Sequence, residues 1–392
     1  MNECTPILDT GLRGASVAST RISDVNGKLG KLIYRGYLVA DLAQKSSYEE
    51  IIFLLLRERL PQKDELAELR AELNEKRKLP REIFAAMEAL PRDTPPMDVL
   101  QAMVPLLAHG DAHIKERELE SSMKSAVNII AGLCSITTAW ERIRNGKDPV
   151  MPRDDLGHAG NFLYMLKGRD PLPEMVNFFD TALILHAEHS FNASTFTARQ
   201  VASTRAHIYA AISAAIGSLS GELHGGANVR VMEMLKEIGS SDMIDEYIEK
   251  RLESGGLIMG LGHAVYQVDD PRALILAPMS ERVGKITGDT KWYELSSEVE
   301  KRAKQAFKAR KKMDIFVNVD FYSASLFYAM GIPMDLFSPV FAVSRVCGWA
   351  AHVIEEQFAL AAPKPALYRP GASYIGEYCG PDECVFVPFD ER

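Results

Sequence analysis

The spacing of apolar residues constrains the fold of this chain more than any other feature, because the spacing is helical over most of the length. In the segment 227–239, Val229, Met232, Leu235 and Ile238 fall on one face of a helix. The same period runs through the segments 47–60, 115–144, 208–221 and 336–360. About fourteen or more such helices follow residue 47, so the sequence predicts an all-α protein.

The first forty residues are the exception to this pattern. The segments 16–25 (SVASTRISDV) and 28–37 (KLGKLIYRGY) flank the pair Asn26-Gly27. An Asn-Gly pair between two such runs is typical of a tight hairpin turn. We therefore predict a small β-hairpin at the N-terminus.

Composition excludes several classes of protein. The chain has 392 residues and a formal net charge of −8, and its basic residues are dispersed apart from a run at 308–312. Binding of nucleic acid needs a basic face, so we expect no such partner. No run approaches about 18 uninterrupted apolar residues, and the N-terminus does not read as a signal peptide. We expect a cytoplasmic protein that does not contact a membrane.

The five cysteines form no Cys-x-x-Cys pair. Reduced, structural thiols are therefore the expectation. An alternative is a disulfide that joins Cys4 to Cys379 or Cys384 and so closes the chain.

Two domains are predicted without a flexible linker between them. Residues 223–330 are richer in charge than their flanks and form the predicted small helical domain. Residues 1–222 and 331–392 form the large one. Glycine-bearing stretches at 221–228 and 329–333 join the two, an arrangement typical of an enzyme that closes over its substrate.

His224 is the first candidate catalytic residue. It directly precedes Gly225 and Gly226, between the predicted helices 208–221 and 227–239. A helix N-terminus offers unpaired N–H groups and a positive dipole, which favour a neutral imidazole beside a developing negative charge. The alternative is a tight turn whose histidine only caps or packs.

Two further candidates also lie at helix or glycine boundaries. His263 follows Gly260 and Gly262, so a ligand could approach its backbone closely. Its alternative is a buried, satisfied histidine. Asp320 begins an apolar helical run, and its alternative is a helix N-cap.

Arg345 is the most anomalous cation, because it lies in a segment, 336–352, that is otherwise nearly free of charge. Arginine is rarely buried without a partner, so an anionic ligand would explain it. Arg272 and Arg369 lie beside prolines in loops. For each of these two, a surface ion pair is the alternative.

No motif for metal, nucleophilic or dinucleotide chemistry is present. His186 and His189 flank Glu188, but a zinc hydrolase needs the glutamate next to the first histidine of His-Glu-x-x-His. No Gly-x-Ser-x-Gly occurs, and no Gly-x-Gly-x-x-Gly follows a strand. We expect no metal and no cofactor. What remains is acid–base chemistry on a substrate with several carboxylates.

Five motifs in order resemble the citrate synthase family: HGGAN at 224–228, GLGHAVYQVDDPR at 260–272, NVDFYSAS at 318–325, VSR at 343–345 and RPGASYIG at 369–376. The resemblance extends from about residue 10 over nearly the whole chain. One motif alone would be weak, whereas five in order are specific. The last one departs mildly, because Gly371 stands where many relatives have a basic residue.

The resemblance implies a two-domain helical homodimer without a metal, in which acetyl-CoA and oxaloacetate are substrates. By the same resemblance, His224 bonds the thioester carbonyl, Asp320 removes the methyl proton and His263 protonates the ketone. The resemblance also implies that oxaloacetate is bound by His189, Arg272 and Arg345, and by Arg369, which reaches across to the partner subunit's site. The residues that it implies for CoA binding are Leu257, Ile258, Met259, Gly260 and Leu261.

Some alternatives stay open at this point. A 2-methylcitrate synthase, which uses propionyl-CoA, has a similar sequence around residues 185–199. From other classes, the alternatives are a metal-dependent hydrolase and an inactive helical scaffold. We expect the small-residue faces of 115–144 and 336–360 to supply the dimer interface. We also expect no control by NADH, since the segment typical of hexameric family members has no counterpart before residue 10.

Overall fold

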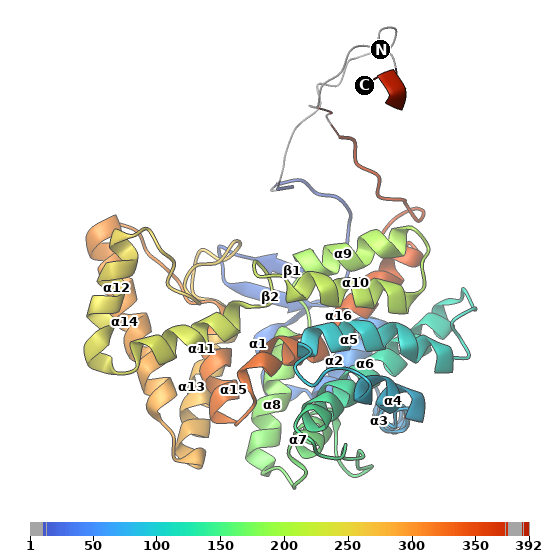
Figure 1. The fold of residues 1–392 in the computed structure, drawn as a ribbon, viewed down its shortest axis with the longest axis horizontal. Helices are drawn as coiled ribbons and strands as arrows, with labels where there is room; N and C mark the ends of the chain where they lie inside the picture. The colour runs from blue at the N-terminus through green and yellow to red at the C-terminus, as the bar shows by residue number, and fades with distance from the viewer. Residues whose placement is uncertain (1–10, 13, 373, 375–385, 387, 392) are drawn as a thin grey trace.

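The computed structural model describes residues 11–12, 14–372, 374, 386 and 388–391, and the all-α prediction is confirmed within them (Figure 1). Sixteen α-helices are present in these ranges. The first ten are α1 (Val39–Lys45), α2 (Tyr48–Arg57), α3 (Lys63–Lys76), α4 (Arg81–Glu88), α5 (Pro96–Leu107), α6 (Leu119–Arg144), α7 (His158–Lys167), α8 (Pro173–His186), α9 (Ala193–Ser203) and α10 (Ile208–Ser220). They are followed by α11 (Ala227–Ile238), α12 (Ile244–Glu253), α13 (Pro271–Thr287), α14 (Lys291–Lys311), α15 (Val319–Ala329) and α16 (Phe337–Gln357). Short 3₁₀ turns lie at Ala108–Gly110, Ser241–Met243, Met334–Leu336 and Phe389–Glu391.

The predicted β-element is present, but it has three strands rather than two. Strands β1 (Ser23–Asn26), β2 (Lys31–Tyr34) and β3 (Tyr37–Leu38) form an antiparallel sheet in that order. The pairing of Asn26 with Lys31 leaves a four-residue turn, 27–30, instead of a two-residue Asn-Gly turn. The side chain of Asn26 shapes this turn by accepting a hydrogen bond from the Leu29 N–H at 3.0 Å.

Helix α16 forms the centre of the larger group of helices. All its residues from Phe337 to Glu356 are buried, and it packs against α6, α9 and α10. This helix is long and apolar enough to cross a membrane by composition, but burial inside the structure is typical of a core helix. Because its faces contact other helices of the same chain, the prediction that it supplies a dimer interface is wrong.

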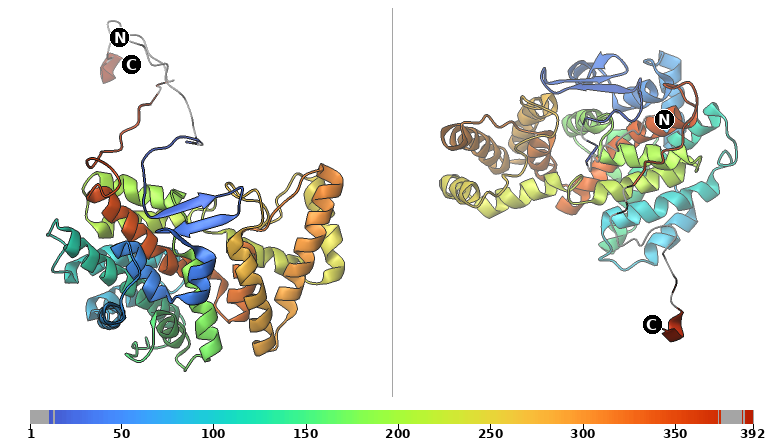
Figure 2. Two further views of the ribbon diagram at one scale, coloured as in Figure 1. Left: turned by 180° about the vertical axis from the view of Figure 1, so that it is seen from behind. Right: turned by 90° about the horizontal axis from the view of Figure 1, so that it is seen from above.

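Helices α11 to α15 lie together at one end of the molecule, and both further views show the same grouping (Figure 2). Within this group α15 packs against α13, α11 and α14. The chain enters it through the turn at 221–226 after α10 and leaves it through 330–336 before α16. Whether residues 223–330 move as a separate domain stays a prediction.

Candidate active site

The site forms where loops from both groups of helices meet. His189 lies just after α8, and His263 and Tyr266 lie in the loop between α12 and α13. The ring centroids of His189 and His263 are 5.5 Å apart, and that of Tyr266 is 5.7 Å from His189. The Nε2 atom of His189 is buried and has no hydrogen-bond partner in the described part of the chain. An unpaired imidazole nitrogen at this place is suited to a polar ligand.

Arg272 is buried at the start of α13 and forms a two-point ion pair with Asp270. Its Nε and Nη2 atoms donate to the two carboxylate oxygens at 3.0 and 2.7 Å. Asp270 is also the N-cap of α13, since it accepts a hydrogen bond from the Arg272 N–H at 3.0 Å. Burial opposes the charged form of Arg272, but Asp270 outweighs burial and raises the pKa of the guanidinium. The surface ion pair considered from the sequence is therefore wrong for this arginine.

Arg345 is buried on α16 without a carboxylate at ion-pair distance in the described residues. Its Nε donates to the carbonyl of His186 at 2.6 Å, and its guanidinium lies 4.6 Å from the ring centroid of Phe341. Burial lowers the pKa of Arg345 to about 10. A buried cation of this kind destabilises the empty fold and favours an anionic ligand.

Asp320 is half-buried in the first turn of α15 and is not its N-cap. The cap is Asn318, whose Oδ1 accepts a hydrogen bond from the Asp320 N–H at 3.0 Å. The carboxylate of Asp320 is therefore not used to start the helix. Burial raises its pKa to about 6, and the positive charges of Arg272 and Arg345 oppose that rise. A carboxylate with a raised pKa is a stronger base.

His224 lies in the predicted break between α10 and α11, and Ser194 at the start of α9 holds its ring. The Ser194 N–H donates to Nε2 of His224 at 3.2 Å, and the Ser194 hydroxyl is 2.8 Å from the same atom. Because Nε2 accepts a hydrogen bond, the proton of the neutral ring is on Nδ1. Burial lowers the pKa of His224 to about 4. The neutral ring can therefore donate from Nδ1 at ordinary pH.

Sequence reasoning missed Ser194, although a signal for it exists. It is the second residue after Asn192, which caps α9 by accepting a hydrogen bond from the Thr195 N–H at 3.1 Å. The Ser194 hydroxyl donates to Asn192 Oδ1 at 2.8 Å and receives a bond from Trp349 Nε1 at 3.1 Å. The Asn-Ala-Ser-Thr run marks the helix start, but not the distant histidine that its backbone would meet.

His263 is fixed in the opposite tautomer. Its Nδ1 accepts hydrogen bonds from the N–H groups of Val265 and Tyr266 at 2.9 and 3.0 Å. The proton of the neutral ring is therefore on Nε2. Burial lowers the pKa of His263 to about 4, and the charge of Arg272 acts in the same direction. The ring is a neutral donor through Nε2.

The predicted CoA segment, residues 257–261, lies beside this loop. Gly260 has a φ of +79°, and a Cβ there would lie 2.6 Å from the Phe321 side chain, so its backbone requires glycine. The carbonyl of Gly260 accepts a hydrogen bond from the Asn318 N–H at 2.9 Å. Leu257 is exposed, whereas Ile258 is buried. The segment is thus tied to the start of α15, and its role in binding CoA stays a prediction.

A buried network of polar side chains begins next to the site. Glu188 precedes His189, and its Oε1 accepts a hydrogen bond from Nε2 of His352 at 3.0 Å. Nδ1 of His352 accepts one from Arg199 at 3.0 Å. All three side chains are buried, so the network connects the His189 loop to α9 across α16.

The network continues to the segment that carries Arg369. Arg199 forms ion pairs with Glu355 and Glu356 at 2.7 Å each, and the Tyr368 hydroxyl donates to Glu356 at 2.6 Å. Tyr368 is thereby tied to α16, and its N–H donates to the Ser203 hydroxyl of α9 at 3.2 Å. The next residue, Arg369, is exposed. Its role across a subunit interface stays a prediction.

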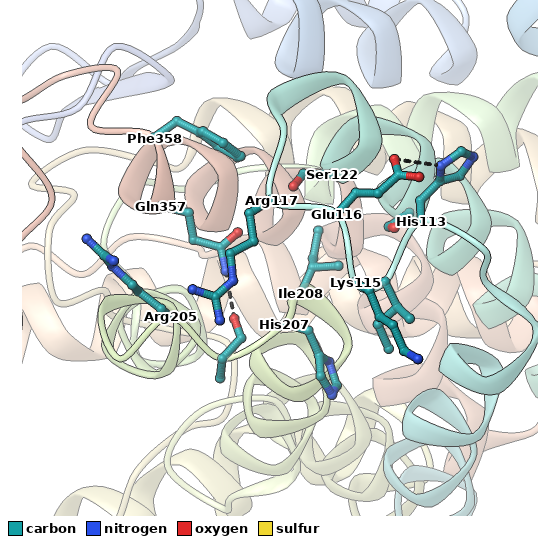
Figure 3. A pocket seen from close by; sticks show the side chains of 13 residues that line it. His113, Lys115, Glu116, Arg117, Ser122, Arg205, His207, Ile208, Gln357 and Phe358 are labelled. Carbon is teal, nitrogen blue, oxygen red and sulfur yellow. Dashed lines mark hydrogen bonds and ion pairs between the residues drawn. The ribbon is translucent and has the colours of Figure 1, made fainter.

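A separate cavity lies away from these residues (Figure 3). It has a volume of about 660 Å³ and is lined by residues before and within α6 and around the start of α10, including Lys115, Arg117, Arg205 and His207. None of the predicted site residues lines it.

No group of three or more histidine, cysteine or acidic side chains suited to a metal occurs in the described residues. The cysteines of the considered disulfide, Cys4, Cys379 and Cys384, lie outside the described residues.

The fold and the site together define a helical enzyme with two neutral histidines, a basic carboxylate and two buried arginines that favour an anion. Comparison with known proteins agrees with this class. A family model described as citrate synthase, C-terminal domain, matches residues 11–371. The chain belongs to the citrate synthase family.

Similarity extends over nearly the whole chain. The citrate synthase of Haloferax volcanii is 42% identical over 98% of this chain and 99% of its own length. A 2-methylcitrate synthase of Shewanella oneidensis is 36% identical over 96% and 97%. The crystal structure of citrate synthase from Pyrobaculum aerophilum superposes with a TM-score of 0.90 at 37% identity, covering 100% of this chain and 97% of that one. The ternary complex of Thermoplasma acidophilum citrate synthase with carboxymethyl coenzyme A and oxaloacetate gives 0.89 at 30% identity, covering 97% and 98%.

Proposed function

We propose that the protein is an acyltransferase that condenses acetyl-CoA with oxaloacetate and water to give citrate and CoA, a reaction of the tricarboxylic acid cycle. The observation that carries the proposal is that Asp320, His224 and His263 each lie within the electrostatic influence of one or both of two buried arginines, Arg272 and Arg345. Among the described residues, Arg345 has no carboxylate at ion-pair distance. The bound ligands of the Thermoplasma acidophilum relative support the substrate assignment.

The first step makes a carbon nucleophile. Asp320 removes a proton from the methyl group of acetyl-CoA while Nδ1–H of His224 donates to the thioester oxygen. A carboxylate is a much weaker base than the enolate it must form, so this donor is essential. By analogy with other oxyanion donors, loss of the His224 bond would cost about 2.7 to 4 kcal/mol.

The second step joins the two substrates. The enolate carbon attacks the ketone carbon of oxaloacetate, and Nε2–H of His263 donates to the ketone oxygen as negative charge forms there. Water then hydrolyses the thioester of the citryl-CoA intermediate. His189, Arg272 and Arg345, with Arg369 of the partner subunit, hold the carboxylates by charge-assisted bonds.

Parallel steady-state assays with acetyl-CoA and propionyl-CoA test the proposal. The two acyl groups differ by one methylene, worth roughly 0.8 kcal/mol when buried and about 10- to 200-fold in selectivity. We expect a higher kcat/KM with acetyl-CoA. A preference for propionyl-CoA would instead favour the 2-methylcitrate synthase alternative. CoA release that requires oxaloacetate and survives metal chelation would exclude a metal-dependent hydrolase.

The pH dependence of kcat/KM for acetyl-CoA should follow Asp320. Both site histidines have pKa values of about 4, so they are already neutral near pH 6. Asp320 must be ionised to act as a base, and its pKa is about 6. We expect kcat/KM to rise with pH up to about 6 and to stay flat from roughly pH 7 to 9. A decline over that upper range would mean that a protonated histidine is required.

Subunit exchange tests the proposed homodimer. Arg369→Ala and Asp320→Asn should each be inactive alone if every site uses Arg369 of the partner subunit. In a hybrid dimer one site carries both lesions and the other carries neither, so activity should recover toward about half per exchanged dimer. Exchange proven by mass labelling without any recovery would place Arg369 in the site of its own chain.

A further inference from the structure

The turn between β1 and β2 lies against the loop that carries His263. The carbonyl of Gly27 accepts a hydrogen bond from the Gln267 N–H at 2.9 Å. This bond joins the N-terminal sheet to the loop before α13, far away in the sequence. The turn thus contacts the segment on which a site histidine depends.

The approach at Gly27 is too close for any side chain. A Cβ at this position would lie 2.0 Å from the carbonyl oxygen of Val265 and 2.7 Å from its carbon, whereas real contacts of this kind essentially never fall under 3.0 Å. Gly27 is not in the left-handed region of backbone conformation. The backbone conformation of residue 27 therefore does not require glycine. The requirement comes from the neighbouring loop, which leaves no room for a Cβ.

Val265 is held from both sides by this arrangement. Its carbonyl lies against Gly27, and its N–H donates to Nδ1 of His263 at 2.9 Å. The adjacent Tyr266 N–H donates to the same nitrogen at 3.0 Å. These two bonds decide which ring nitrogen of His263 carries the proton. If Val265 were displaced, the proton could occupy either nitrogen.

The same sheet also braces the loop that carries His189. Ser23 of β1 donates through its hydroxyl to Glu188 Oε1 at 2.8 Å and accepts a bond from the Ser190 N–H at 3.0 Å. Tyr34 of β2 donates through its hydroxyl to the Glu188 carbonyl at 2.9 Å. One small sheet therefore contacts both histidine loops, which belong to different groups of helices.

We propose that Gly27 is a positioning residue for His263: its missing side chain lets the β1–β2 turn fix the Val265–Gln267 backbone, which holds the imidazole as an Nε2–H donor. The importance of this role for turnover rests on the function proposed above.

Gly27→Ala tests the proposal. The new methyl must displace the Val265 carbonyl by at least 1 Å, the difference between 3.0 and 2.0 Å. A misplacement of about 1 Å can lower turnover roughly 10²-fold, and we expect a fall of that order in kcat. Two matched controls should keep wild-type kcat: Gly110→Ala, where an added Cβ meets nothing within 4 Å, and Lys28→Ala, an exposed neighbour in the same turn.

A spectroscopic readout separates positioning from general destabilisation. In protein labelled with ¹⁵N-histidine, the His263 signals, assigned with a His263→Gln variant, should show a single Nε2–H tautomer in the wild type and a mixture in Gly27→Ala. Unchanged signals with wild-type kcat would overturn the proposal. So would a variant that is merely less stable, with full kcat per folded molecule. If Gly27→Ala changes the tautomer but the wild-type protein does not catalyse the proposed reaction, the positioning role of Gly27 stands and only the proposed reaction is refuted.

Hydrogen exchange keeps the test decisive if Gly27→Ala does not fold. In the wild-type protein, the amides of Val265, Tyr266 and Gln267 are all hydrogen-bonded and should exchange slowly. Exchange of these amides as fast as that of the exposed residues 312–314 would show that the turn does not hold the loop, and the proposal would be wrong.

Discussion

Asp320→Asn should lower kcat by about 10² to 10⁴ while the protein stays folded, as expected for loss of a general base. Asparagine has nearly the same shape as aspartate but cannot take a proton. The cap of α15 would remain, because Asn318 supplies it. Steady-state kinetics with saturating oxaloacetate would measure the loss. Near-normal turnover would remove Asp320 from the mechanism.

The same substitution should raise stability at alkaline pH. Burial raises the pKa of Asp320 from its ordinary 3.8 to about 6, so ionisation destabilises the folded state as pH rises through this range. At pH 8 the asparagine variant should be more stable by at most about 3 kcal/mol, and at pH 5 by about half as much. Urea unfolding at both pH values would measure the difference. Asp314→Asn, at an exposed aspartate, should show neither effect.

Arg345→Leu should weaken the binding of oxaloacetate by about 2 to 5 kcal/mol, or roughly 30-fold to several thousand-fold. The side chain is a buried cation whose only hydrogen bond among the described residues goes to the His186 carbonyl. Removing the charge should therefore cost little stability or even increase it, because none of the acidic side chains that the structure describes lies at ion-pair distance from Arg345.

Isothermal titration with oxaloacetate and urea unfolding would separate the two effects. Arg77→Leu is the matched control, since Arg77 is equally buried but bonds Asn74 and His158, which lie outside the site. It should lose stability and keep oxaloacetate affinity. If Arg345→Leu behaves in that way instead, Arg345 has a structural role.

Much of the local structure could be predicted because it depends on neighbouring residues. The helical period gave the all-α class, and the break before Gly225 and Gly226 separates α10 from α11 as predicted. α2 begins after Ser47, where a capping box with Glu50 satisfies both backbone groups. Such features require only residues a few positions apart, so one sequence is sufficient to find them.

Features that depend on distant residues could not be predicted in the same way. The N-cap pair Asp270 and Arg272 is local, and the Asp-Pro-Arg run could have indicated it, but its burial depends on packing. The bond between Ser194 and His224 joins α9 to the turn after α10. The small-residue character of α16 indicated close packing correctly, yet not that the contacts lie within one chain.

The buried chain of polar groups from Glu188 through His352 and Arg199 to Glu356 has a consequence for how this protein can change during evolution. Each side chain in it is hydrogen-bonded to a buried neighbour, so losing Arg199 would leave buried carboxylates without their cation, at a cost of about 3 to 5 kcal/mol. That is a large share of the stability of a typical protein. These positions should therefore be replaced together or kept, and a lineage that alters Arg199 must also alter Glu355 or Glu356.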